Sequence, residues 1–212
     1  MMKSSGRLIT LEGGEGSGKS TQSYKIQEFL WTQNLDVLVT REPGGSEGAE
    51  LIRQLLVQGQ IGTCDPMSEY LLFSAARRDH LIKTVWPALE KGQWVICDRF
   101  YDSSRAYQGA GHFLDTTFMD QVYHTVANSL QPDLTFIFDI DPELGLNRAL
   151  SRQNREDRYE HFNLDFHQRI RQAYLDIAER EPNRCHVIQA QHSVENVYQN
   201  IIDVLTYRFF SK

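Results

Sequence analysis

The sequence predicts an α/β protein of three layers, in which helices flank a five-stranded parallel sheet. Two observations predict it. Five short apolar runs of strand length recur along the 212 residues, and amphipathic stretches of helix length separate them. A chain of this length, with 41% hydrophobic residues, can bury one sizeable core, so residues 1–212 are expected to form a single domain.

The elements follow one another in an alternating order. The predicted strands are 7–12 (RLITLE), 36–41 (DVLVTR), 93–97 (QWVIC), 133–139 (DLTFIFD) and 184–189 (RCHVIQ). The predicted helices are 19–33, 46–58, 66–91, 114–129, 142–152, 162–180 and 193–210. Asp141, followed by Pro142, and Ser193 are predicted helix N-caps. Ligands of such sheets bind beyond the carboxyl ends of the strands, so a site is expected there.

The composition argues against several function classes. A net charge of −6 leaves no basic excess to attract nucleic acid or an anionic membrane, so neither is an expected partner. The cysteines, Cys64, Cys97 and Cys185, are spaced too widely for a zinc site or a redox pair. The sequence contains no apolar stretch long enough for a signal peptide or a membrane span. We therefore expect a cytoplasmic protein.

A phosphate-binding loop follows the first predicted strand. Residues 13–21 read GGEGSGKST and satisfy the pattern GxxxxGK[ST] between a strand and a helix. Glycines let backbone N–H groups turn toward an anion, Lys19 can reach the β- and γ-phosphates, and Ser20 can ligate Mg²⁺. This predicts a P-loop NTPase fold. The predicted ATP-binding residues are Gly13, Gly14, Glu15, Gly16, Ser17, Gly18, Lys19, Ser20 and Thr21.

Charged residues also follow the third and second predicted strands. Asp98 can hold Mg²⁺ directly or through water, and Arg99 offers a fork of donors to a phosphate. Both lie at a strand's carboxyl end, where phosphates are expected. The second strand ends in REPGG, residues 41–45, a turn that brings Arg41 and Glu42 to the same rim.

Several motifs in register resemble bacterial thymidylate kinases. They are LEGGEGSGKST, TREPGG, LLFSAARRDHL, CDRFYDSSRAYQG, PDLTFIFD and an arginine-rich lid, in that family's order and spacing over nearly the whole chain. The resemblance implies a homodimeric kinase that transfers a phosphoryl group from ATP, with Mg²⁺, to dTMP for dTTP synthesis. One position departs from the family pattern, because Arg105 stands where a small or apolar residue is expected.

The resemblance also implies a pocket for dTMP. Phe73 would stack on thymine, and Arg77, four residues later on the same helix face, would donate to a base oxygen. Such a donor disfavours the amino group of cytosine. From the pattern alone, Phe73 could equally be a core residue. The other implied contacts are Ser104 and Gln108 near the base, Tyr107 beside the 2′ position, Glu15 at the 3′-hydroxyl, Arg53 and Arg99 on the acceptor phosphate, and Glu42 near the metal or that phosphate.

A mobile lid is predicted at about residues 150–160. Arg152, Arg155 and Arg158 fall in a stretch of weak periodicity, and residues 14–17 of the P-loop contain no arginine. A closing lid could supply the positive charge that phosphoryl transfer requires. Thymidylate kinases that lack a P-loop arginine place basic residues in the lid. The predicted catalytic residues are therefore Lys19, Asp98 and Arg99 from the motifs above, together with Arg152 and Arg158 from the lid.

Direct in-line transfer is the expected chemistry. The acceptor phosphate is already mostly dianionic at neutral pH, so neither a covalent intermediate nor a general base is needed. Two other interpretations are open at this point. A GTPase-like switch is disfavoured because no NKxD-type segment occurs. The other is a P-loop kinase for another small metabolite or for a different nucleotide, and here Phe73, Arg77 and Gln108 favour a planar base in the acceptor pocket.

Overall fold

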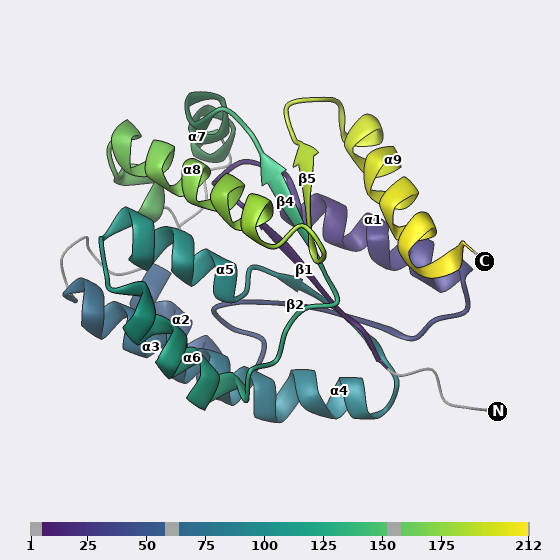
Figure 1. Cartoon of the computed structure of the whole chain (residues 1–212), viewed down its shortest axis with the longest axis horizontal. Helices are drawn as coiled ribbons and strands as arrows, with labels where there is room; N and C mark the ends of the chain where they lie inside the picture. Colours follow the sequence, from purple (N-terminus) through teal and green to yellow (C-terminus); the bar gives the residue numbers. More distant parts are fainter. Residues whose placement is uncertain (1–5, 58–63, 152–157, 212) are drawn as a thin grey trace.

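A computed structural model of the chain describes residues 6–57, 64–151 and 158–211. Five strands form one sheet in the order β2-β3-β1-β4-β5, and every neighbouring pair is parallel (Figure 1). The strands are β1 (Leu8–Gly13), β2 (Val37–Arg41), β3 (Trp94–Asp98), β4 (Leu134–Asp139) and β5 (Cys185–Gln189). The predicted five-stranded parallel sheet is confirmed.

Helices cover both faces of this sheet (Figure 1). One face packs against α1 (Lys19–Thr32) and α9 (Val194–Leu205). The other packs against α3 (Pro66–His80), α6 (Thr116–Ala127) and α8 (Leu164–Arg180). The remaining α-helices are α2 (Glu47–Val57), α4 (Trp86–Glu90), α5 (Tyr101–Ser104) and α7 (Pro142–Leu150). Within the described ranges, no helix is both long and apolar enough to traverse a lipid bilayer.

The strands bury side chains on both faces. Successive residues of a strand point to opposite sides of the sheet. Ile9 and Ile96 therefore pack toward α1 and α9, whereas their neighbours Leu8 and Val95 pack toward α3 and α6. This double burial explains why the strands read as continuous apolar runs instead of alternating ones.

The predicted helix starts at Asp141 and Ser193 are confirmed. The Asp141 carboxylate accepts hydrogen bonds from the backbone N–H groups of Glu143 and Leu144. The Ser193 hydroxyl accepts one from the N–H of Asn196.

Three helical segments differ from the prediction. The predicted helix 193–210 is α9 followed by a π-helical segment, η4, at Thr206–Phe210. The predicted helix 66–91 is α3, a π-helical turn at Leu81–Val85 and α4 in succession. Residues 101–111, for which no helix was predicted, form α5 and a π-helical segment, η2, at Arg105–Gly111. The two glycines of η2 weaken any helical signal in the sequence. Burial of Ala106, Tyr107 and Gln108 against neighbouring elements stabilises the segment instead.

Candidate active site

The P-loop joins β1 to α1 and leaves the start of α1 open to a ligand. Gly18 occupies the N-cap position of α1 with φ 91° and, as a glycine, has no side chain with which to cap the helix. The first N–H groups of a helix need a partner, and an anion can supply it. Gly16 has φ 64°, and a Cβ there would lie 2.0 Å from the carbonyl oxygen of Gly145. The loop can therefore approach α7 only with glycine at this position.

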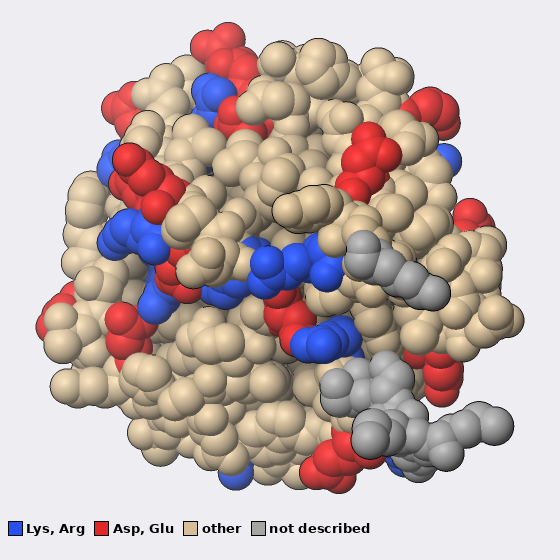
Figure 2. Space-filling view, turned by 45° about the vertical axis from the view of Figure 1, so that its right-hand side comes forward, with Lys and Arg blue, Asp and Glu red and all other residues tan. Residues whose placement is uncertain are grey.

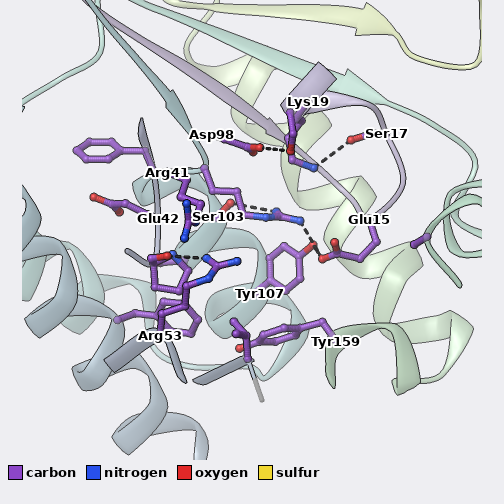
Figure 3. A pocket seen from close by; sticks show the side chains of 18 of the residues that line it. Glu15, Ser17, Lys19, Arg41, Glu42, Arg53, Asp98, Ser103, Tyr107 and Tyr159 are labelled. Atoms are coloured by element: carbon purple, nitrogen blue, oxygen red, sulfur yellow. Dashed lines mark hydrogen bonds and ion pairs between the residues drawn. The ribbon is translucent and has the colours of Figure 1, made fainter. Parts of the chain in front are cut away.

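Lys19 closes the P-loop from inside. Its ammonium donates to the carbonyl oxygens of Gly13 at 3.0 Å and Gly14 at 2.8 Å. It also donates to the Ser17 hydroxyl at 3.1 Å (Figure 3). Burial, and then the positive charge of Arg99, lower the pKa of Lys19 to about 8. An anion bound in the loop would therefore stabilise the protonated form of Lys19.

Ser20, in the first turn of α1, contacts Asp98 at the end of β3. The Ser20 hydroxyl donates to Oδ2 of Asp98 at 2.5 Å. The contact forms because β1 and β3 are adjacent, with Leu11 of β1 paired to Asp98 of β3. A hydroxyl and a carboxylate oxygen are the donors that Mg²⁺ prefers, so the two predicted metal ligands fit this ion.

Arg99 lies at the centre of the site. Its guanidinium donates to the Gly13 carbonyl oxygen at 3.0 Å and to Oε1 of Glu15 at 2.8 Å, and it lies over the Tyr107 ring at 5.0 Å. The hydroxyl of Tyr107 donates to the same Glu15 oxygen at 2.7 Å (Figure 3). Burial alone would raise the pKa of Glu15, but Arg99 and Lys19 lower it to about 2. Glu15 is therefore ionised at neutral pH and available to accept from a sugar hydroxyl.

Glu12 accepts from Ser103 and Tyr174, the two hydroxyls to which Arg99 donates, and its role was not predicted from the sequence. Its fully buried carboxylate accepts from the N–H of Phe100 at 2.8 Å and from the hydroxyls of Ser103 at 2.6 Å and Tyr174 at 3.2 Å. Burial, and then the charge of Asp102, raise the pKa of Glu12 to about 7. The sequence feature that could have indicated this role is an acidic residue at the end of an apolar predicted strand.

Arg77 and Glu42 form a buried ion pair. Nε of Arg77 donates to Oε2 of Glu42 at 2.7 Å, and the other Glu42 oxygen lies 3.0 Å from Nδ1 of His80. Nη2 of Arg77 also donates to the Ser104 hydroxyl at 3.1 Å. Burial would raise the pKa of Glu42, but Arg77 and His80 lower it. Glu42 was predicted to lie near the metal or the acceptor phosphate. In the structure one of its carboxylate oxygens contacts Arg77 and the other contacts His80.

Most of the residues predicted to bind the two substrates line one cavity of about 240 Å³. Figure 3 shows Lys19 and Asp98 at one end, Arg53 and Tyr159 at the other, with Glu15 and Tyr107 between them. The lining includes residues 15–20, Glu42, Arg53, Phe73, Arg77, Asp98, Arg99, Ser104, Tyr107 and Gln108. Lys and Arg side chains also gather along a band across one face of the molecule (Figure 2). The positive charge is thus local, in a chain whose net charge is −6.

The remaining predicted positions are distributed differently. Gly13 and Gly14 contribute carbonyl oxygens to Lys19, and the exposed side chain of Thr21 lies on α1 outside the cavity lining. Arg53 donates to the carbonyl oxygen of Pro43 at 2.6 Å. Arg152 and Arg155, with most of the predicted lid, lie outside the described residues.

Arg158 lies in a buried ion pair and outside the cavity lining. Its Nη2 donates to Oε2 of Glu69, and its Nη1 donates to the carbonyl oxygen of Leu56 at 2.8 Å. This arrangement differs from the predicted contact with the transferring phosphoryl group. The physical reason is that the buried Glu69 carboxylate, on α3, provides a desolvated countercharge.

Arg105, the position that departs from the family pattern, is held by acids outside the cavity. It donates to Asp120 at 3.1 Å and to Glu181 at 2.8 Å. Its guanidinium also lies 4.9 Å from the centre of the Tyr101 ring. The arginine therefore packs against α6 and the end of α8 and does not line the cavity.

Comparisons with known proteins agree with this geometry. Residues 11–201 match the family model of thymidylate kinase. A thymidylate kinase of Dinoroseobacter shibae is 48% identical over 205 residues, which cover 97% of this chain and 99% of that protein. One of Afipia carboxidovorans is 46% identical over 208 residues, covering 97% and 91%. The crystal structure of a thymidylate kinase from Ehrlichia chaffeensis superimposes with a TM-score of 0.76 at 38% identity and covers 94% of this chain and 98% of that one.

Proposed function

The chain belongs to the thymidylate kinase family, and we propose that the cavity described above is where it transfers the γ-phosphoryl group of ATP to dTMP. The family's reaction supplies dTDP for dTTP synthesis. Family membership decides against the GTPase-like switch. The assignment rests on the lining of the cavity, which contains both the P-loop and the residues proposed to bind the base, Phe73, Arg77 and Gln108.

ATP is proposed to bind at the P-loop end. The open start of α1 and the Lys19 ammonium would hold the β- and γ-phosphates. Ser20 and Asp98 would hold Mg²⁺, which when bound offsets the negative charge of the phosphate oxygens. Their hydroxyl and carboxylate oxygens, already in contact, support this assignment.

dTMP is proposed to bind at the other end. Phe73 would stack on thymine, with Arg77, Ser104 and Gln108 at the base edge. The proposed roles around the rest of the nucleotide are Tyr107 beside the 2′ position, Glu15 at the 3′-hydroxyl, Arg53 and Arg99 on the acceptor phosphate, and Glu42 behind Arg77. Arg99 and Lys19, on either side of the transfer path, would bring two mutually repelling anions together.

In-line attack then needs little from the protein besides position and charge. A 5′-phosphate oxygen of dTMP attacks the γ-phosphorus, and ADP leaves along the same line. We propose that one domain, residues 1–212, performs this step and that Arg152, in the lid of about residues 150–160, adds positive charge to it. Arg158 would have to leave its buried ion pair with Glu69 to contribute in the same way.

MgATP binding is expected to weaken above about pH 8. In the free protein Lys19 loses its proton with a pKa of about 8, whereas the ammonium is the form that attracts phosphate. Above that pKa, binding must take up a proton, so the Kd should rise by up to about tenfold per pH unit. Titration calorimetry across this range would measure the rise, which a Lys19→Met variant should lack. A constant Kd would contradict the expectation.

We propose that the protein is a cytoplasmic homodimer. Leu51 and Leu55 on α2 are 63% and 64% exposed, and Leu71 on the adjacent α3 is 46% exposed. Neighbouring helices with exposed leucines are typical of a subunit interface. Sedimentation equilibrium at micromolar concentration would test this, and the mass of a single chain would contradict it.

An acceptor panel tests the reaction itself. The purified protein is incubated with MgATP and, separately, dTMP, dUMP, dCMP, dGMP, dAMP or UMP, and ADP and diphosphate products are separated by chromatography. We expect stoichiometric dTDP and ADP with dTMP, far faster than with dCMP, and no product when EDTA removes Mg²⁺. ADP release that is independent of the acceptor would contradict the kinase assignment. A faster reaction with another monophosphate would contradict the roles of Phe73, Arg77 and Gln108.

A further inference from the structure

Glu69 is a buried carboxylate directly behind the wall of the acceptor pocket. It lies on α3 and is 1% exposed. Three donors reach it from distant parts of the chain. Nη2 of Arg158 donates to Oε2, and the Tyr159 hydroxyl and Nε2 of Gln108 donate to Oε1 at 2.7 Å and 3.0 Å. Two of these donors, Gln108 and Tyr159, also line the cavity.

This contact determines which way the Gln108 amide points. A glutamine side chain can present either its carbonyl oxygen or its amino group, and the hydrogen-bond network decides between them. A carboxylate paired with a guanidinium has only acceptors to offer, so Gln108 must turn Nε2 toward Glu69. Its Oε1 then faces the other way. Among the described residues, no donor forms a hydrogen bond with that oxygen.

We propose that Glu69 is a positioning residue for acceptor selection, which fixes Gln108 so that its carbonyl oxygen faces a base whose ring nitrogen carries a proton. The inference rests on the proposed binding of the base beside Gln108. Thymine and uracil carry such a proton on N3, next to a carbonyl oxygen at C4. Cytosine presents a lone pair at N3 and an amino group at C4.

Arg77 supplies the complementary donor. Nε of Arg77 is used on Glu42, and Nη2 on Ser104 and the Phe100 carbonyl oxygen. In the described part of the chain no hydrogen bond engages Nη1, and the residue lines the cavity. Ser104, bonded to Arg77, lies one helical turn before Gln108. The pocket wall therefore offers an acceptor from Gln108 and a donor from Arg77, which match thymine at two atoms and oppose cytosine at both.

Arg158 provides the countercharge that keeps the buried Glu69 carboxylate in place. A buried carboxylate without a countercharge is strongly disfavoured, and Arg158 supplies that charge from η3 (Arg158–His161). The Leu56 carbonyl oxygen anchors Arg158 in turn at 2.8 Å. Phe73 and Arg77 follow Glu69 at intervals of four residues on α3, so they share its face of the helix.

The test is a Glu69→Gln variant assayed for base discrimination. An amide at position 69 can donate or accept, so Gln108 becomes free to present either end to the base. We expect the ratio of kcat/KM for dTMP to kcat/KM for dCMP to fall by about 10- to 100-fold. The ratio for dTMP over dUMP should stay unchanged, since both bases carry a proton on N3. Both ratios are independent of the fraction of folded protein, and competitive inhibition by dCMP gives the same comparison where its turnover is too slow.

Two further variants complete the design. Glu69→Gln together with Arg158→Gln removes the unpaired guanidinium and should show the same loss of discrimination if the single variant folds poorly. Glu181→Gln is the matched control, because it breaks arginine pairs with Arg105 and Arg184 outside the cavity lining. It should keep the wild-type ratios.

The wild-type protein gives an independent readout. Its affinity for 3-deaza-dUMP, which has a carbon in place of N3–H, should be about 10- to 100-fold lower than for dUMP. Equal affinities, or unchanged dTMP/dCMP discrimination in folded Glu69→Gln, would overturn the inference. A parallel change in the dTMP/dUMP ratio would overturn it too, because it would indicate a general loss of pocket shape. Absence of dTMP turnover in the wild type would instead refute the proposed function.

Discussion

Replacing Lys19 with methionine is expected to lower kcat for dTDP formation by about 10³-fold. The ammonium is buried in the P-loop and touches Gly13, Gly14 and Ser17, so it reaches the region where charge develops on the transferring group. Methionine has a similar length and no charge, which preserves the packing of the loop. Rapid-quench measurement of dTDP at saturating MgATP and dTMP would give kcat directly.

The matched control for this variant is Lys25→Met, on the same helix. Lys25 pairs with Glu195 at 3.7 Å on the far side of α1, outside the cavity lining. It should retain wild-type kcat. If Lys19→Met kept more than about a tenth of the activity, other residues would have to stabilise the negative charge on the transferring phosphoryl group. The role assigned to Lys19 would then be wrong.

The second large effect is expected from Arg99→Lys, which should lower kcat/KM for dTMP by about 10²- to 10³-fold. Arg99 adopts φ 68°, and its N–H donates to the Leu11 carbonyl oxygen, a backbone arrangement that lysine can keep. The variant therefore retains the charge and changes the fork of donors. A lysine ammonium cannot hold Gly13, Glu15 and an acceptor phosphate at once with the same geometry.

Steady-state kinetics with dTMP varied would test this expectation, with circular dichroism to verify folding. Arg105→Lys is the control, since Arg105 makes comparable ion pairs with Asp120 and Glu181 outside the cavity lining. It should leave kcat/KM unchanged. Wild-type kcat/KM in Arg99→Lys would show that the fork is dispensable and that only the charge at this position matters.

Prediction from the sequence succeeded where the signal is contiguous. The P-loop is nine consecutive residues between a strand and a helix, so its local context identifies it. The five strands were predicted within about one residue of their observed ends, because each is a short apolar run closed by polar residues. The helix caps at Asp141 and Ser193 are equally local.

Prediction from the sequence reached less far where several remote segments decide the outcome together. The segment 101–111 contains two glycines and gave no helical signal, yet it folds as α5 and η2 because it packs against α8 and α6. Arg158 was predicted to face the transferring phosphoryl group, and the structure pairs it with Glu69, 89 residues earlier. No periodicity in the sequence connects those two positions.

The sequence by itself determined the sheet and the phosphate cradle, because a strand end carries the P-loop to one edge of a parallel sheet. Arg53, Phe73, Arg77 and Gln108 lie on α2, α3 and η2, and only the folded chain brings them to the same cavity. Only the tertiary structure decided which of the 28 acidic residues faces which of the 22 basic ones. Pairs such as Glu15 with Arg99, Glu42 with Arg77 and Glu69 with Arg158 are chosen by burial. A desolvated charge tolerates few partners, whereas in the unfolded chain every charge is satisfied equally well by water.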